Sequence, residues 1–291
     1  MSTTVATHSG PFHADDVLAW ALIRIFFDDD ADLIRTRDQS LIEAADIVVD
    51  VGGLHDPSTL RFDHHQHEYT GSLSSAGMVL QWLESSERIT AALAAELRSQ
   101  VVDYVDDVDN GRRMPDTGVP CFAQMVGAYN QGCNTLEEFD ASFRRVGDAA
   151  MGMVAGLVMG HTARLASAAT VVTAMEAARS AGRNVIFMDR YHTWKDIYFE
   201  HDGTNHPTEY VLHPGIDGRW RAVGIPPVRG SFAQKRPFPE AWAGLRDAEL
   251  AAVTGVEGSL FCHKNRFIAV FTTREGALEA MGRFDLLIGF N

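Results

Sequence analysis

The sequence predicts an α/β protein, with a mostly parallel sheet flanked by helices and a second, smaller domain of mixed α+β structure. Strand-like and helix-like patterns alternate through the N-terminal half, which is typical of a parallel sheet covered by helices. Residues 136–181 are rich in Ala, Met, Val and Glu and contain no Pro, which predicts one or two long helices. We therefore expect one domain at 1–135, a helical linker at 136–182 and a second domain at 183–291.

The elements of the first domain follow from its apolar runs. Its expected strands cover residues 3–7, 32–36, 46–51 and 60–63, and its expected helices cover residues 17–27, 76–83 and 91–105. The 46–51 run is continuous and β-branched, as in a strand that is buried on both faces of a parallel sheet. The carboxyl ends of parallel strands share one edge, which is where ligands usually bind in such sheets.

The second domain mixes strands and helices without a regular alternation. Its expected strands cover residues 184–188, 210–212, 220–224, 259–262 and 267–272, and its expected helices cover residues 239–253 and 273–281. The first of these helices has Pro239 at its start, where Pro is well tolerated. His192, His201, His206 and His213 lack ligand spacing, so we expect structural or surface roles for them.

The charge of the chain is unevenly divided. Its net charge is −14; residues 1–160 hold 10 Lys or Arg against 25 Asp or Glu, whereas residues 161–291 hold 15 against 14. Such a balance disfavours strong, sequence-independent binding of long duplexes, which needs many phosphate contacts. Single-stranded RNA or DNA and short oligonucleotides remain open as partners, and the C-terminal half would supply the cations for them.

Cysteine usage and hydropathy indicate a cytoplasmic protein. Cys121, Cys133 and Cys262 are scattered and form no CxxC motif, so neither a disulfide framework nor a thiolate zinc site is expected. No basic, apolar leader follows Met1, and the best apolar run, residues 149–159, is too short to span a bilayer. We expect no membrane partner, and a homo-oligomer remains open.

The segment from Phe62 to Gln66 places two adjacent histidines behind an aspartate, at the end of a short apolar run. Imidazole nitrogens and carboxylate oxygens together suit Mn²⁺, Fe²⁺ or Zn²⁺, and Asp63 could fix the tautomer of a neighbouring histidine. Adjacent residues in a strand point to opposite sides, so both histidines reach one site only if the chain turns there. His64 could then bind metal while His65 meets the substrate; the alternative is a chance pair on a polar turn.

Three more clusters of hard ligands lie where strands or helices end. They are His8 to Asp16, the strand end at Asp50, and the acidic helix end with Asp106 and Asp109. Taken singly, each fits a helix-start carboxylate, a turn former or a solvated face. Four clusters in order, interleaved with strand and helix units, indicate a single site at the carboxyl edge of the sheet.

This ordered set resembles the DHH phosphoesterase superfamily, whose members arrange such His and Asp motifs around a pair of Mn²⁺ ions. It is most similar to the melanocyte-proliferating-gene branch, also labelled metal-dependent protein hydrolases. The similarity includes residues 244–250, 261–263 and 273–278 and spans nearly the whole chain. Two positions depart from the pattern: most of the superfamily has Asp in place of His13, and residues 265–270 replace a glycine-rich turn.

The resemblance implies which residues act. The implied metal ligands are His8, His13, Asp15, Asp50, His64 and an aspartate among Asp106 and Asp109. Asp50 would bridge two divalent ions, expected to be Mn²⁺, with Mg²⁺, Fe²⁺ or Zn²⁺ as alternatives. His65 would contact a phosphate oxygen, oriented by Asp63. His263 and Arg274 in the second domain would bind substrate phosphates, since Arg matches phosphate oxygens bidentately.

The resemblance also implies a binuclear metal-dependent phosphoesterase, with a 3′–5′ exonuclease on RNA or short DNA as the leading hypothesis. Two ions would activate water and stabilise the attacking and leaving oxygens at phosphorus. One alternative is a small-molecule phosphatase or pyrophosphatase. A metal-dependent peptide hydrolase is disfavoured because HExxH is absent. An inactive metal-binding scaffold is disfavoured by the intact ligand set.

Overall fold

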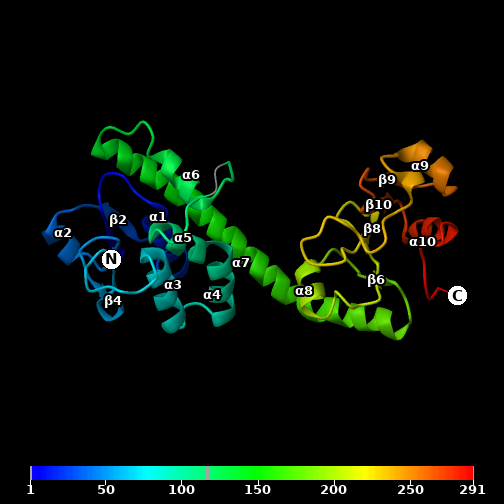
Figure 1. Ribbon diagram of the computed structural model, residues 1–291, viewed down its shortest axis with the longest axis horizontal. Coiled ribbons are helices and arrows are strands. Elements are labelled where there is room, and N and C mark those ends of the chain that lie inside the picture. The colour runs from blue at the N-terminus through cyan, green and yellow to red at the C-terminus, as the bar shows by residue number, and fades with distance from the viewer. Residues whose placement is uncertain (1, 116–117, 291) are drawn as a thin grey trace. The chain divides into compact units, whose positions relative to one another are not determined.

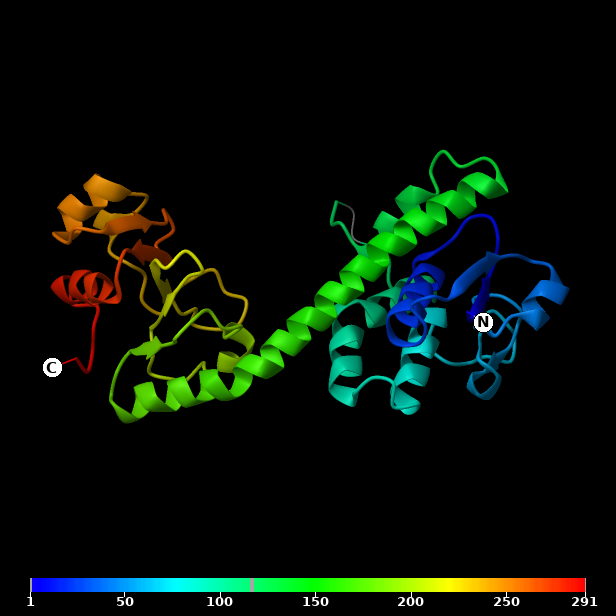
Figure 2. The same cartoon turned by 180° about the vertical axis from the view of Figure 1, so that it is seen from behind.

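The computed structural model describes residues 2–115 and 118–290, and the chain forms two compact units. Unit 1 comprises Met1–His161 and unit 2 comprises Thr162–Asn291, each with its own five-stranded sheet (Figure 1). The expected long helix is confirmed as one 45-residue helix, α7 (Leu136–Ser180), which is also seen from behind in Figure 2. It belongs to both cores, because Phe143 packs in unit 1 and Met175 packs in unit 2. The chain therefore divides inside α7.

The sheet of unit 1 is mostly parallel, as predicted. Its strands are β1 (Thr4–Thr7), β2 (Asp32–Arg35), β3 (Ile47–Val49), β4 (His55–Asp56) and β5 (Arg61–Phe62). They lie in the order β2-β1-β3-β5-β4, and only the edge strand β4 is antiparallel to its neighbour. The carboxyl ends of β1, β2, β3 and β5 consequently share one edge.

Helices cover this sheet. They are α1 (Ala14–Phe26), α2 (Gln39–Ala44), α3 (Ser75–Ser85), α4 (Ala91–Leu97), α5 (Asp103–Asp109) and α6 (Phe122–Tyr129). The expected helix over residues 91–105 is present as α4 and α5, joined by a π-helical turn, Arg98–Val102. The α1 helix packs against α3 and is buried from Ala14 to Ile23, so its polar first turn lies inside the protein. The short helices α2 and α6 were not predicted.

Unit 2 has a mixed sheet. Its strands are β6 (Val185–Phe187), β7 (Tyr210–Pro214), β8 (Trp220–Gly224), β9 (Ser259–Cys262) and β10 (Ile268–Phe271), in the order β6-β7-β8-β10-β9. All five expected strands are confirmed, with only the β6–β7 pair parallel. One face packs on α9 (Asp247–Thr254) and α10 (Arg274–Arg283), and the other packs on α7 and the unpredicted α8 (Lys195–Glu200).

The expectation of one helix over residues 239–253 was wrong. A 3-10 turn, Glu240–Trp242, is separated from α9 by residues that pair with β9 instead. Gly244 donates its N–H to the Cys262 carbonyl, and Cys262 donates to the Leu245 carbonyl. Gly244 has a φ of +78°, which a helix does not allow. None of the helices in residues 2–115 and 118–290 combines the length and the apolar character needed to cross a bilayer.

Candidate metal centre

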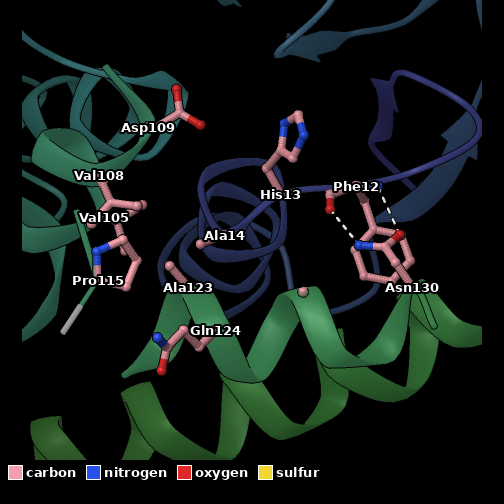
Figure 3. Close-up of a pocket in the computed structure, with 11 residues that line it drawn as sticks. Phe12, His13, Ala14, Val105, Val108, Asp109, Pro115, Ala123, Gln124 and Asn130 are labelled. Atoms are coloured by element: carbon pink, nitrogen blue, oxygen red, sulfur yellow. Dashed lines mark hydrogen bonds between the residues drawn. The ribbon is translucent and has the colours of Figure 1, made fainter. Parts of the chain in front are cut away.

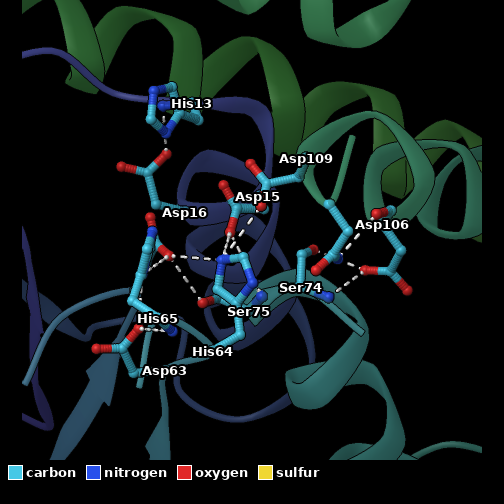
Figure 4. A network of polar contacts seen from close by, with 12 residues as sticks. His13, Asp15, Asp16, Asp63, His64, His65, Ser74, Ser75, Asp106 and Asp109 are labelled. Atoms are coloured by element: carbon cyan, nitrogen blue, oxygen red, sulfur yellow. Dashed lines mark hydrogen bonds and ion pairs between the residues drawn. The ribbon is translucent and has the colours of Figure 1, made fainter. Parts of the chain in front are cut away.

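Polar side chains from four segments of unit 1 meet at the carboxyl edge of its sheet. His8 follows β1, Asp50 follows β3, and His64 follows β5. Asp15 and Asp109 reach the same place from the start of α1 and the end of α5 (Figure 4). The predicted parallel order of the strands explains why these side chains lie close together, because it brings the ends of distant segments to one edge of the sheet.

Asp50 lies at the centre of this group and is 3% exposed. Its Oδ2 is 3.2 Å from His8 Nε2, whereas its Oδ1 is 3.4 Å from His64 Nε2. The two carboxylate oxygens therefore face two different sets of ligand atoms. Its φ is +55°, a left-handed conformation that non-glycine residues rarely adopt. A hydrogen bond from its N–H to the Phe62 carbonyl, at 3.0 Å, holds the backbone in this position.

Three carboxylates surround one nitrogen of His64. Its Nε2 lies 3.1 Å from Asp109 Oδ2, 3.4 Å from Asp50 Oδ1 and 3.6 Å from Asp15 Oδ2. Burial lowers the pKa of His64, but its contacts with Asp109 and Asp50 outweigh burial and raise the pKa to about 10. Burial and the Asp50 charge raise the pKa of Asp15 well above its ordinary value. The buried side chains around His64 therefore carry more negative than positive charge.

His8 and His13 contribute to further groups of ligand atoms at this site. His8, His13 and Asp50 each offer a ligand atom within 4.8 Å of the others, and His13, Asp15 and Asp109 form a similar group. Burial lowers the pKa of His8, but the adjacent Asp50 and Asp16 carboxylates more than offset it and raise the pKa overall. Both groups could hold a metal ion.

Asp16 contributes to the site although the sequence did not single it out as a ligand. Its Oδ2 is 3.3 Å from His8 Nε2, and its Oδ1 accepts the backbone N–H groups of His13 and Val17 at 3.0 and 2.8 Å. Burial, together with the Asp50 charge, raises its pKa to about 7. Two consecutive carboxylates in the first turn of an otherwise apolar helix could have indicated from the sequence that Asp16 belongs to the site.

The adjacent histidines both reach Asp50, because β5 ends at Phe62 and the chain turns. Their ring centroids are 4.4 Å apart, and His65 Nδ1 is 3.5 Å from Asp50 Oδ1. Asp63 accepts the His65 backbone N–H at 3.2 Å, contacts His65 Nδ1 at 2.8 Å, and accepts the N–H of Gly53 at 2.6 Å. The His65 side chain is 58% exposed, so Asp63 fixes a histidine that remains accessible.

A cavity of about 460 Å³ lies over these groups, lined by His8, His13, Asp50, His65 and Arg37 among others. Arg37 follows β2 and was not predicted. It is exposed, and among the described residues it makes no ion pair. The neighbouring Arg35 is instead engaged with Asp140 and the Gly10 carbonyl. Arg37 could have been indicated by its position directly after the strand expected at residues 32–36.

Asp106 forms hydrogen bonds with the start of α3 rather than with the candidate metal ligands. Its Oδ1 accepts the N–H and the hydroxyl of Ser74, at 2.9 and 2.6 Å, and the N–H of Gly77 at 3.2 Å. It thereby caps the start of α3 from a neighbouring helix, and it belongs to none of the metal-sized clusters of the described residues. Ser75 donates its hydroxyl to Asp50 Oδ1 at 3.1 Å. The pair Ser74-Ser75 before an apolar run was a recognisable helix-start signal.

The two residues expected to bind phosphate in unit 2 are not brought together. His263 lies before β10, where its N–H bonds to the Ile268 carbonyl at 3.0 Å and its ring packs 4.4 Å from that of Phe267. Arg274 lies beyond the opposite end of β10, with its guanidinium 4.5 Å from the centre of the Phe187 ring. An extended strand separates residues at its two ends, so one phosphate cannot contact both side chains where they now lie.

The chain can be compared with solved structures and with curated proteins. It matches the structure of RecJ from Thermus thermophilus in complex with Mn²⁺, at 12% identity and a TM-score of 0.29, covering 97% of this chain and 52% of the RecJ chain. The MYG1 protein of Chlamydia muridarum is 38% identical over 283 residues, which are 96% of this chain and 95% of that protein.

A human relative also matches over most of its length. The MYG1 exonuclease of Homo sapiens is 32% identical over 314 residues, which cover 94% of this chain and 84% of the human protein. The family model for MYG1 exonucleases, described as "Uncharacterised protein family (UPF0160)", matches residues 4–283. The resemblance to the melanocyte-proliferating-gene branch is confirmed, and the chain belongs to the MYG1 exonuclease family.

Proposed function

We propose that the chain is a metal-dependent exonuclease that uses two divalent ions at the carboxyl edge of the unit 1 sheet. Membership of its family makes it a hydrolytic enzyme of the nuclease class. The observation that carries the two-ion proposal is Asp50, whose two oxygens face separate groups of ligand atoms. A carboxylate in this arrangement is suited to bridge two ions.

The donor atoms fit a pair of divalent ions. His8, His13 and Asp50 would hold one ion, and Asp15, Asp50, His64 and Asp109 would hold the other. Asp15 Oδ1, Asp50 Oδ2 and His64 Nε2 are buried without a hydrogen bond to any described group, which is costly unless another partner binds them. A mixture of imidazole and carboxylate ligands suits Mn²⁺, with Mg²⁺, Fe²⁺ and Zn²⁺ as alternatives.

Once bound, the ions would activate water and stabilise the charge that develops on the phosphate oxygens. The remaining task, binding and orienting the phosphate, falls to side chains that line the same cavity. His65 is accessible and fixed by Asp63, so it can donate a hydrogen bond to a phosphate oxygen. Arg37 offers a guanidinium that no described carboxylate neutralises.

We propose single-stranded RNA or short DNA as the substrate, degraded from its 3′ end. The acidic balance of residues 1–160 disfavours a long duplex, because only a few cations are available to neutralise phosphates. Inorganic pyrophosphate is the second candidate, since a cavity of about 460 Å³ is large enough for a small phosphate compound. We place the enzyme in the reducing cytoplasm, where its three free cysteines would stay as thiols.

The test is to incubate the purified chain with Mn²⁺ and four substrates in parallel: a 5′-labelled RNA oligonucleotide, the same oligonucleotide labelled at its 3′ end, pyrophosphate and a peptide. The proposal predicts a ladder of shortened 5′-labelled products and early release of the 3′ label as a mononucleotide. Asp109→Asn serves as the control, and it should abolish both signals. Cleavage of pyrophosphate or peptide alone would overturn the proposal.

A further inference from the structure

A second cavity borders the metal centre inside unit 1. Its volume is about 400 Å³, and it begins at His13 and Asp109, two of the candidate ligands. Beyond this border Figure 3 shows the apolar side chains of Val105 and Val108 from α5 and Ala123 from α6, together with the polar side chains of Gln124 and Asn130. No Lys or Arg is among its described lining residues, so an anionic group would find no cation there. The cavity is therefore suited to a neutral, largely apolar ligand.

One face of α6 forms a wall of this cavity. Ala123, Gln124, Gly127 and Asn130 line it, at the spacing of a single helix face. The Asn130 amide accepts the N–H of Phe12 at 3.1 Å and donates to its carbonyl at 2.7 Å, as the dashed lines in Figure 3 show. These bonds fix α6 to the residue preceding His13, so the wall keeps its position relative to the metal centre.

Gly127 leaves part of the α6 wall without a side chain. A glycine within a helix costs about 1 kcal/mol relative to alanine, and nothing in the packing demands one at this position. A Cβ added to Gly127 would meet no atom within 4 Å, and its φ lies outside the left-handed region that favours glycine. The missing side chain leaves space at the wall that faces the metal ligands.

We propose that this cavity is the subsite for the nucleobase of the nucleotide whose phosphate lies at the metal centre. This inference rests on the proposed nuclease function and specifies how the substrate is held. A nucleobase is flat, uncharged and apolar on both faces, so it matches walls made of Val105, Val108 and Ala123. The Asn130 amide is already engaged with Phe12, so its task is to hold the wall rather than to bind the base.

The test compares two leucine substitutions on α6 in the full-length, metal-loaded protein. Gly127→Leu places a side chain in the cavity, whereas Ala128→Leu places the same side chain on the exposed, neighbouring face of the helix. Calorimetry measures binding of AMP and of ribose 5-phosphate, which lacks the base. Kinetics are measured on an oligonucleotide and on a matched one whose terminal nucleotide is abasic. Metal content and thermal unfolding are recorded for each variant.

Gly127→Leu should weaken AMP binding and lower kcat/KM on the intact oligonucleotide by about tenfold, the scale on which an apolar pocket discriminates. Binding of ribose 5-phosphate, cleavage of the abasic oligonucleotide and metal content should not change, and Ala128→Leu should match the wild type throughout. Equal AMP binding by the wild type and Gly127→Leu would overturn the subsite. A wild-type protein that cleaves neither oligonucleotide would instead overturn the nuclease proposal, while the AMP comparison would still decide whether the cavity binds a base.

Discussion

Asp50 has a left-handed backbone and a buried carboxylate that lies between two groups of ligands. For a residue other than glycine, that backbone conformation costs about 1–2 kcal/mol, and such strain persists mainly at functional positions. The end of a β-branched run predicted where Asp50 lies, but no local pattern predicted its φ. The bond from its N–H to Phe62 depends on the pairing of strands that are distant in the sequence.

Replacing Asp50 with Asn tests the bridging role. Asn tolerates the left-handed conformation and keeps the shape of the side chain, so Asp50→Asn removes charge without adding backbone strain. We expect the variant to lose affinity for both ions, because one residue serves both. Elemental analysis after dialysis against limiting Mn²⁺ measures the loss, and circular dichroism checks the fold. Retention of two ions with wild-type affinity would exclude Asp50 as the bridge.

His64 and His65 should separate metal binding from catalysis. His64 faces three carboxylates in the interior, so His64→Ala should lower metal content. His65 is exposed and held by Asp63, so His65→Ala should keep both ions and lower kcat by about 100-fold, as for the loss of one oriented donor. The two variants are compared by metal analysis and by turnover of the labelled oligonucleotide. Equal metal loss in both would contradict this division.

Among the helices and strands, the sequence predicted those whose apolar residues recur at a regular spacing, and it missed the short ones. All strands of unit 2 and the long α7 were predictable, because their runs are apolar and clearly bounded. The two-residue strand β4 carries no periodic signal, and the helices α2, α6 and α8 each have eight residues or fewer. The missed α6 matters most, since it forms a wall of the cavity beside the metal centre.

Two aspartates in the last turn of α5 differ in role: Asp106 is structural, and Asp109 is a candidate metal ligand. Asp106 caps α3, so Asp106→Ala should lower the free energy of unfolding of the metal-free protein by about 1–2 kcal/mol, the usual cost of a lost cap. Asp109→Asn should lower Mn²⁺ affinity with a smaller effect on the metal-free protein. Urea unfolding in the presence of a chelator, combined with metal titration, measures both effects. Loss of metal without loss of stability in Asp106→Ala would reverse these assignments.

The two units differ in where they bury charged and titratable side chains. Unit 1 gathers buried carboxylates and histidines at one edge, whereas unit 2 buries single histidines within its core. The uneven charge along the chain predicted the acidic site, but the contact between Ser75 and Asp50 and the place of Arg37 at the cavity follow from how distant segments pack. Of the histidines for which we expected structural or surface roles, His192, His206 and His213 are buried, whereas His201 is exposed.

Unit 2 should lose stability in mild acid. Burial lowers the pKa of both His206 and His213 below 6.5, and the nearby Arg179 and Lys235 charges lower that of His206 further. The unfolded chain then binds protons that the folded chain does not, so the free energy of unfolding should fall as the pH drops below about 6.5. Urea unfolding at several pH values should give a shallower decline for His206→Gln and His213→Gln than for the wild type. His201→Gln is the control, and a decline equal to that of the control in both variants would refute the assignment.

The proposed site holds two ions, one on each side of Asp50, and the anomalous scattering of Mn²⁺ in crystals of the full chain would locate them. We predict two peaks, one among His8, His13 and Asp50 and the other among Asp15, Asp50, His64 and Asp109, a pair close enough to act on one phosphate. A single peak that does not touch Asp50, or peaks away from the carboxyl edge of the unit 1 sheet, would contradict it.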